Sequence, residues 1–182
     1  MSRRTNLTNL QFAILGLIGQ GEKSAYTIQK IFTETPMARY SASPGAIYPA
    51  TRRLEESKLV VSRRESGEKG RARKVYATTA AGEKQLGDWL RQPSDINEVT
   101  READIAMLRF AFMGGRLSDA EIRRFLSTFI VASQAHRADL DRRRERFLAD
   151  GVSHAALTLQ AGVMGVDAQL RWAKQAARAF AG

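Results

Sequence analysis

The side chains with the clearest chemical role are cations that gather in two neighbouring stretches of the chain. The first stretch holds Arg52 and Arg53, and the second holds Arg63, Arg64, Lys69, Arg71, Arg73 and Lys74. A guanidinium group donates paired N–H bonds to a guanine edge or a phosphate, and an ammonium group binds phosphate as a point charge. Both stretches therefore indicate a polyanionic partner, which could be a nucleic acid or an acidic membrane surface.

The distribution of charge places that partner in the first half of the chain. The 182 residues carry a formal net charge of +10. Residues 1–93 hold 16 Lys and Arg against 8 Asp and Glu, whereas residues 94–182 hold 13 against 11. We therefore expect the first half to bind the polyanion and the second half to have another task.

Enzymatic chemistry has little support in the sequence. The chain has no cysteine, which excludes a thiolate zinc site and a cysteine nucleophile. His136 and His154 have no second ligand at metal-binding spacing, so we expect no metal and no cofactor. Ser153 lies in a segment that lacks the second glycine of a nucleophile elbow, and it is better interpreted as a helix cap. We predict that the protein is not an enzyme.

The elements that must position the cations begin with two short helices. Apolar residues at helical spacing predict helices over 8–19 and 24–34, with Thr8 and Ser24 as their N-caps. Ser43 then caps a third helix, which should end near residue 58 and which begins on a proline that has no amide to leave unpaired.

A basic hairpin follows the third helix. The strand-like pieces 59–65 and 72–78 flank a polar turn with two glycines, which predicts a two-stranded wing. A fourth helix starts after Thr79. Three helices followed by a basic hairpin are the order of a winged helix-turn-helix, in which the third helix enters the major groove.

The third helix separates into a core side and an exposed side at 100° per residue. The core side holds Ile47, Ala50, Thr51 and Leu54. The opposite side begins with small or flat residues and ends with charged ones, with Gly45, Pro49, Arg52 and Glu56 flanked by Tyr48 and Arg53. Close approach followed by forked donors is what major-groove contact needs. The alternatives are a solvated helix face for the arginines and an ordinary charged sheet edge for the hairpin cations.

The second half is predicted to be helical. Pro93 and Ser94 mark a boundary, which divides the chain into residues 1–92 and 93–182. A helix from Ser118 to about Ala149 would span about 45 Å. A last helix starts at Ser153 and should turn Leu157 inward. Long helices with wide apolar faces predict an antiparallel pair completed by a second subunit.

Four aromatic side chains and one methionine are the candidates for binding an apolar or planar effector. Core packing and the dimer interface are the alternative explanations for all of them. Trp172 is our first choice because Gln169 and Gln175 would place polar groups beside its indole. The other candidates are Trp89, Met107, Phe110 and Phe112.

Several of these segments resemble the PadR family of transcriptional regulators. The most specific is Ser43-Pro44-Gly45-Ala46-Ile47-Tyr48-Pro49, followed by Arg53-Leu54-Glu55. Leu10 to Gly16, Ser24-Ala25-Tyr26, and Tyr76-Ala77-Thr78-Thr79 ahead of Gly82 add to it, although Ala77 stands where the family often has a bulkier residue or Arg. The resemblance covers about residues 7–92, and the remainder is similar to the helical C-terminal region of longer members and to the virulence-activator type.

The resemblance implies a mainly helical protein with a winged helix-turn-helix and a C-terminal dimerisation domain. It further implies a homodimer on a roughly palindromic double-stranded operator, usually a repressor released by a small aromatic molecule or another signal. Together with the residue patterns, it gives the predicted DNA-binding residues Ser24, Tyr26, Ser43, Gly45, Ala46, Tyr48, Pro49, Arg52, Arg53, Lys69, Arg71 and Arg73.

Two other partners remain as alternatives, an acidic protein bound by the wing and, less favoured, an anionic membrane. No apolar run approaches the roughly 18 residues of a membrane span. Arg3 and Arg4 ahead of Leu10 to Ile18 imitate a secretory signal, but Gln11 interrupts that stretch and the first helix needs it. We expect a cytoplasmic protein without a membrane partner.

Overall fold

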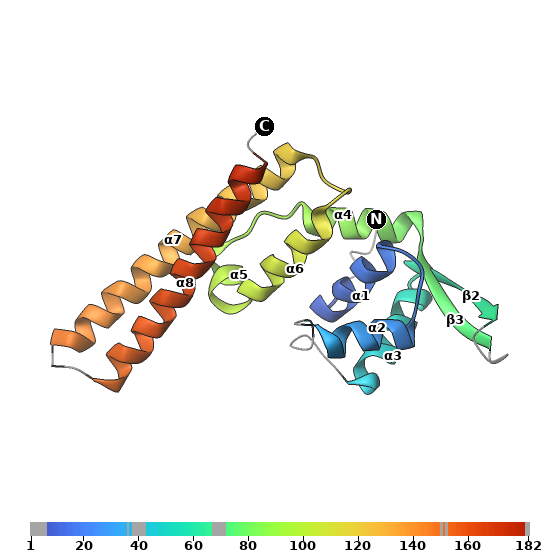
Figure 1. Ribbon diagram of the computed structural model, residues 1–182, viewed down its shortest axis with the longest axis horizontal. Coiled ribbons are helices and arrows are strands. Elements are labelled where there is room, and N and C mark those ends of the chain that lie inside the picture. The colour runs from blue at the N-terminus through green and yellow to red at the C-terminus, as the bar shows by residue number, and fades with distance from the viewer. Residues whose placement is uncertain are drawn as a thin grey trace. The chain divides into compact units, whose positions relative to one another are not determined.

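The chain folds into two compact units, residues 1–89 and residues 90–182. The computed structural model describes residues 7–35, 37, 43–66, 72–149, 151 and 153–180. Within these ranges both units are mainly helical, and every strand belongs to the first unit (Figure 1). None of the helices in these ranges is long and apolar enough to cross a membrane.

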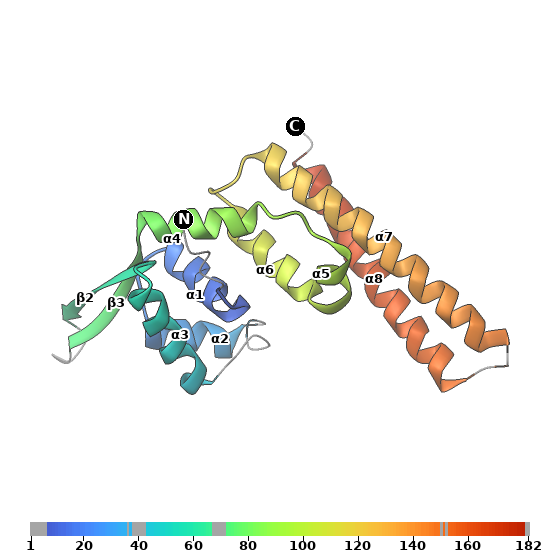
Figure 2. The same cartoon turned by 180° about the vertical axis from the view of Figure 1, so that it is seen from behind.

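The first unit consists of helices around a small antiparallel sheet. Its elements are α1 (Asn9–Gly19), β1 (Lys23–Ser24), α2 (Ala25–Glu34), α3 (Pro44–Glu56), β2 (Val60–Ser66), β3 (Ala72–Thr78) and α4 (Ala80–Leu90). The strand order is β1-β3-β2, and β2 and β3 form the long hairpin seen in Figure 2. The predicted winged helix-turn-helix is therefore present, with one strand more than the sequence indicated.

The additional strand is β1, which pairs Lys23 with Tyr76 and Ser24 with Val75. Two residues are too few to show the alternation by which a strand is recognised. Because β1 leads directly into α2, its pairing with β3 fixes the start of α2 against the wing.

The predicted caps of the first two helices are confirmed. Thr8 and Gln11 form a capping box, in which Thr8 Oγ1 accepts from the Gln11 amide at 3.2 Å and the Thr8 amide donates to Gln11 Oε1 at 2.9 Å. Ser24 Oγ accepts from the Thr27 amide at 3.1 Å. Ser43 occupies the N-cap position of α3, but its side chain makes no capping hydrogen bond, so this part of the prediction is wrong.

The first turn of α3 instead closes on the backbone of Ser43. The Ser43 carbonyl accepts from the amides of Ala46 and Ile47 at 3.0 and 3.2 Å. The helix then continues through Pro49 to Glu56. Its predicted core residues Ile47, Ala50, Thr51 and Leu54 are all buried.

Aromatic packing and one close backbone approach hold α4 in the first unit. The rings of Phe12 and Trp89 stack in parallel with their centroids 4.4 Å apart. Gly82 in α4 lies directly against the carbonyl of Leu59, the residue that precedes β2. A bare Cα lets the helix approach this carbonyl, and the approach sets where the wing begins.

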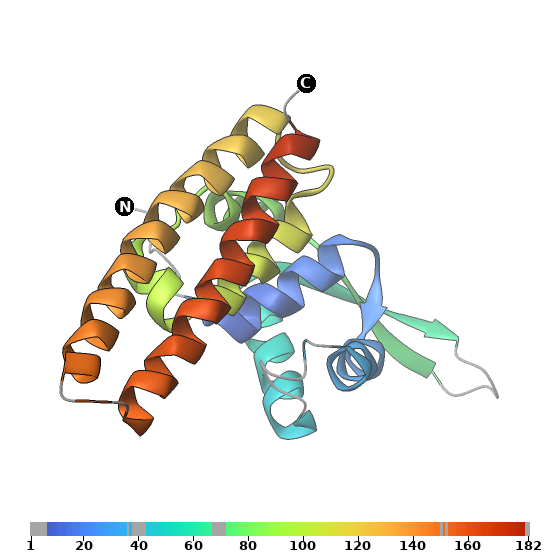
Figure 3. The same cartoon turned by 60° about the vertical axis from the view of Figure 1, so that its left-hand side comes forward.

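The second unit is a group of helices dominated by an antiparallel pair. Its helices are α5 (Ile96–Arg101), α6 (Ala103–Met113), α7 (Asp119–Ala149) and α8 (His154–Ala179). Figure 3 shows α7 and α8 side by side, and Arg137 of α7 binds Asp167 of α8 at 2.7 Å. The predicted caps Ser118 and Ser153 accept from the amides of Glu121 and Ala156 at 3.3 and 3.2 Å.

The apolar face of the pair differs from the prediction at the start of α8. Leu157 was expected to point inward, but it is 60% exposed, and the neighbouring Ala156 takes the buried position. Val131 of α7 and Met164 of α8 are exposed to a similar extent. Large apolar side chains therefore remain uncovered on both long helices.

Candidate nucleic-acid interface

An open groove of about 1030 Å³ lies in the first unit between the start of α2, helix α3 and strand β3. Its lining consists of Ser24, Ala25, Tyr26, Thr27, Lys30, Tyr48, Ala72, Arg73, Lys74 and Tyr76. The groove thus brings together four of the predicted DNA-binding residues from three segments, namely Ser24, Tyr26, Tyr48 and Arg73.

Two tyrosines of the groove have exposed side chains that a ligand can contact. Tyr26 is 68% exposed and Tyr48 is 49% exposed. Ser24 is buried, and its hydroxyl is already engaged with the Thr27 amide and with Thr27 Oγ1 at 2.9 Å. Ser24 therefore starts α2, whose N-terminal end is favourable to an anion because the helix dipole is positive there.

The two β3 cations of the groove are held in ion pairs. Lys74 Nζ lies 2.8 Å from Glu55 Oε2, and Arg73 Nη2 lies 2.7 Å from Glu65 Oε2. The hydrogen bonds from Lys74 and then from Ser62 lower the pKa of Glu55, and the hydrogen bond from Arg73 lowers the pKa of Glu65. Both carboxylates are consequently charged at neutral pH, and each neutralises part of the basic surface.

The exposed side of α3 carries the remaining candidates of that helix. Gly45, Tyr48, Pro49, Arg52 and Arg53 are all exposed, in agreement with the helical periodicity. The side chain of Arg52 is 79% exposed and donates from Nε to Glu56 at 2.7 Å. An exposed pair of this kind is weak, so the guanidinium can exchange its partner at little cost.

The other predicted contact residues have mixed positions. Ser43 is exposed and Ala46 is half-buried, and neither lines the groove. Of the three predicted wing cations, only Arg73 can be placed, because Lys69 and Arg71 lie outside the described residues.

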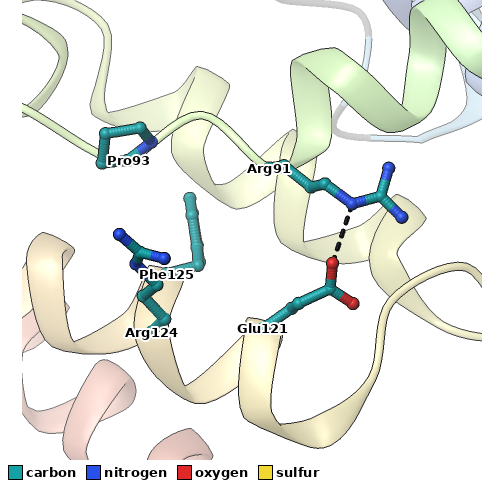
Figure 4. A pocket seen from close by; sticks show the side chains of 5 residues that line it. All are labelled: Arg91, Pro93, Glu121, Arg124 and Phe125. Atoms are coloured by element: carbon teal, nitrogen blue, oxygen red, sulfur yellow. Dashed lines mark hydrogen bonds and ion pairs between the residues drawn. The ribbon is translucent and has the colours of Figure 1, made fainter.

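A smaller pocket of about 200 Å³ lies in the second unit (Figure 4). Arg91 and Pro93 contribute from the segment after α4, and Glu121, Arg124 and Phe125 contribute from α7. Arg91 Nε donates to Glu121 Oε1 at 2.7 Å, drawn as the dashed line in Figure 4.

The carboxylate of this pocket has its own partners in the protein. The backbone amide and hydroxyl of Ser118 donate to Glu121 Oε2 at 2.8 and 2.9 Å. The Ser118 amide, followed by Arg91, lowers the pKa of Glu121 from 4.5 to about 2. Glu121 therefore serves to begin α7 and to hold Arg91, and it is ionised throughout the neutral range.

The four aromatic effector candidates are not gathered into one place. Phe110 and Trp172 meet edge to face with ring centroids 5.1 Å apart, and both are half-buried in the second unit. Phe112 is buried at 3% exposure in that unit, whereas Trp89 is stacked in the core of the first. In the described part of the chain, no group of three or more His, Cys, Asp or Glu side chains could hold a metal ion.

Comparison with known proteins decides the family. The Negative transcriptional regulator PadR of Bacillus subtilis (strain 168) is 31% identical over 140 residues, which cover 77% of this chain and 75% of that relative. The chain belongs to the PadR-like family of transcriptional regulators. Residues 14–88 match the pattern of the Transcriptional regulator PadR-like family, and residues 104–181 match that of Virulence activator alpha C-term.

Solved structures of PadR proteins match this chain over most of its length. Bacillus subtilis PadR in complex with operator DNA has a TM-score of 0.48 at 25% identity, covering 95% of this chain and 99% of that one. Bacillus subtilis PadR in complex with p-coumaric acid has a TM-score of 0.44 at 24% identity, covering 98% and 99%. The PadR-like regulator BC1756 of Bacillus cereus has a TM-score of 0.40 at 24% identity, covering 94% and 97%.

Membership of the PadR-like family confirms three predictions from the sequence. The chain is a PadR-type regulator, its first unit is a winged helix, and it belongs to a family of regulators rather than enzymes.

Besides Ala25 and Ala72, four further residues of the groove were absent from the predicted DNA-binding set. They are Thr27, Lys30, Lys74 and Tyr76. Lys30 is one helical turn beyond Tyr26 and Thr27 on α2, so helical spacing from Tyr26 could have found it. Lys74 and Tyr76 share one face of β3 by strand alternation, and their sequence signal was obscured by the many other cations of the wing.

Proposed function

We propose that this PadR-like regulator binds a specific operator duplex as a homodimer, with residues 1–92 contacting DNA and residues 93–182 forming the dimer. The observation that carries the proposal is the groove, in which the start of α2, Tyr48 of α3 and the β3 cations face one open space. A phosphate backbone needs positive helix ends and cations, and base reading needs a helix that protrudes beside them.

The two parts of the interface have different tasks in this proposal. Tyr26 and Lys30 of α2 and the cations of β3 hold phosphates, and Lys69 and Arg71, which lie outside the described residues, add positive charge. Tyr48 and Arg52 on the exposed side of α3 contact base edges. Gly45 and Pro49, which are small or flat and lie on the same side of α3, allow the helix to approach the floor of the DNA major groove closely.

The dimer is supported by the uncovered apolar side chains of the long helices. Val131, Leu157 and Met164 are each at least 60% exposed, and Phe147 and Leu148 at the end of α7 are also exposed. A second copy that covers these residues would remove apolar surface from water and place two α3 helices on one duplex. We therefore expect the operator to contain two inverted half-sites.

Repression and release by a small molecule complete the proposal. The 31% identical relative is a negative regulator by name, which supports repression. The half-buried pair of Phe110 and Trp172 supports an effector that is aromatic or hydrophobic. Such an effector should change Trp172 fluorescence and weaken operator binding, and a Trp172→Phe variant separates its signal from Trp89. Unchanged fluorescence and DNA affinity across a panel of such compounds would contradict this part.

Two arginine substitutions separate base reading from charge. Arg52→Ala should reduce the preference for the operator over point-mutated operators by about tenfold, because a forked donor to one base edge is lost. Arg73→Ala should weaken binding to every duplex alike and reduce the slope of log K against log salt by about 1, because one phosphate contact is lost. Fluorescence anisotropy titrations at several salt concentrations measure both quantities.

Lys84→Ala is the matched control for the loss of one positive charge. Lys84 is an exposed cation of α4 that pairs with Asp88 and does not line the groove. Its substitution should leave both the preference and the slope close to those of the wild type. The assigned roles are wrong if Arg52→Ala weakens operator and random duplex by the same factor.

Selection of bound fragments from the source genome tests the proposal as a whole. The wild-type chain should enrich one inverted-repeat sequence that overlaps promoters. Enrichment of no sequence, or retention on acidic protein or anionic vesicles in preference to duplex DNA, would point to one of the alternative partners.

A further inference from the structure

Each cation that lines the groove among the described residues is paired with a carboxylate that does not line it. The pairs are Lys30 with Glu34 at 3.7 Å, Arg73 with Glu65 at 2.7 Å and Lys74 with Glu55 at 2.8 Å. Carboxylates of the protein therefore already neutralise part of the positive charge of the groove before any DNA binds.

Glu65 is the most connected of these carboxylates. It lies opposite Arg73 in the β2–β3 register, and its Oε2 accepts from Arg73 Nε at 2.9 Å and Arg73 Nη2 at 2.7 Å. Its Oε1 lies 3.5 Å from Nη2 of Arg63, which also binds Glu22. The Glu65 side chain is 33% exposed, and this carboxylate binds Arg73 closely and Arg63 at a longer distance.

A phosphate that binds Arg73 must compete with this carboxylate. A cation that is already paired with a carboxylate neutralises a phosphate less completely, so fewer counterions are released from the DNA and the cation contributes less to salt-dependent binding. Binding to random DNA is almost entirely electrostatic, whereas an operator complex also gains base contacts from α3. Pairing the groove cations with carboxylates of the protein therefore lowers the affinity for random DNA by a larger factor than the affinity for the operator.

We infer that Glu65 is a specificity residue, which lowers the affinity of this regulator for DNA of arbitrary sequence by holding Arg73 and Arg63 in ion pairs. The inference rests on the proposed function, because it concerns the same groove. Glu55 acts in the same sense on Lys74, whereas the exposed pair of Lys30 and Glu34 is too weak to matter. Glu55 also accepts from Ser62 at 2.5 Å and so joins α3 to β2, which makes Glu65 the cleaner position to test.

Glu65→Gln in the full-length chain is the test, with a random-sequence duplex as the probe. The amide keeps the size of the side chain and one acceptor oxygen, while the negative charge is lost. Affinity for the random duplex should rise about threefold to tenfold at low salt, and the slope of log K against log salt should steepen by about 1. Affinity for the selected operator should rise less, so the ratio of the two affinities should fall.

Asp88→Asn is the control with the same change in net charge. Asp88 pairs with Lys84 at 2.7 Å on α4, away from the groove lining. A rise in random affinity that Asp88→Asn reproduces would overturn the inference, because it would then reflect net charge alone. A fall or no change in random affinity for Glu65→Gln would also overturn it, because a role in holding the wing together predicts weaker binding.

Failure of the proposed function is distinguishable from failure of this inference. If wild type and both variants all leave the duplex unbound at low salt, the proposed function is wrong, and the inference falls with it. If the wild type prefers its operator and Glu65→Gln keeps the same ratio of affinities, only the inference is wrong.

Discussion

Replacing Gly82 by alanine should lower the free energy of unfolding of the first unit by about 3 kcal/mol or more. A Cβ atom at Gly82 would lie 2.0 Å from the Leu59 carbonyl oxygen and 3.0 Å from its carbon. Neither contact can be relieved by a side-chain rotation, because both partners are backbone. Either α4 or the start of β2 must move.

The Leu59 carbonyl has little freedom to move away. It accepts from the Thr79 amide at 3.0 Å and from the Thr79 hydroxyl at 3.2 Å. Thr79 Oγ1 in turn accepts from the Gly82 amide at 3.0 Å. These bonds tie the base of the wing to the first turn of α4, so Gly82→Ala should also misplace Arg73 and weaken DNA binding.

Gly165→Ala is the control for a glycine inside a helix. Gly165 lies in α8, and a Cβ atom there would meet no atom within 4 Å. This variant should gain up to about 1 kcal/mol, because alanine restricts the unfolded chain and favours helix. Urea titrations followed by circular dichroism measure both. Equal midpoints for the two variants would show that the approach of α4 to Leu59 is not tight.

Replacing Arg109 by methionine should cost the second unit about 3 to 5 kcal/mol. Arg109 is only 2% exposed, and its Nη1 donates to Glu98 Oε1 and Oε2 at 2.8 and 3.0 Å. Its Nη2 donates to the carbonyls of Leu90 and Gln92, and the guanidinium lies 4.9 Å from the centre of the Phe125 ring. The Arg109 side chain of α6 therefore contacts the end of α4 and the segment after it, as well as α5 and α7.

The cost comes mainly from the charge that is left behind. Without Arg109, the Glu98 carboxylate, 15% exposed in the wild type, loses its buried partner, and two carbonyls lose a donor. Arg109→Met combined with Glu98→Gln removes the stranded charge and should recover part of the loss. Thermal unfolding of the two variants compares them. The explanation is contradicted if Arg109→Met alone lowers the unfolding temperature no more than Arg109→Met combined with Glu98→Gln.

The sequence was most informative where a periodic pattern was long or a motif was specific. The helical spacing of α3 correctly separated buried Ile47 and Leu54 from exposed Arg52 and Arg53, because burial follows the 3.6-residue repeat. The caps Thr8, Ser118 and Ser153 were also correct. A capping side chain acts on amides two or three residues away, so its information is local.

The sequence was least informative where position depends on distant contacts. β1 exists only because Lys23 and Ser24 meet β3, about fifty residues later in the chain. Helix α5 has six residues and buries only Val99, which leaves no period to detect. Ala156 is buried in the position expected for Leu157. The register of α7 against α8 decides which residue is buried, and contacts along both helices set that register.

The groove could be anticipated only in part for the same reason. Tyr48 and Arg73 were identified on their own elements, but Lys30 and Lys74 gain their place from the meeting of α2, α3 and β3. Arg73 pairs with Glu65 because the register of β2 against β3 places them opposite each other. In a hairpin this polar, the alternation of apolar residues is too weak to predict that register. Partners of cations are therefore harder to predict than the cations.

The central claim is that α3 and the groove read a particular duplex rather than charge alone. The most direct test is the ratio of the affinities of the wild-type chain for its selected duplex and for a shuffled duplex of equal length, measured at physiological salt. The account predicts nanomolar binding to the selected duplex and a ratio of about 10³ or more. A ratio near 1, with both affinities falling together as salt rises, would contradict it.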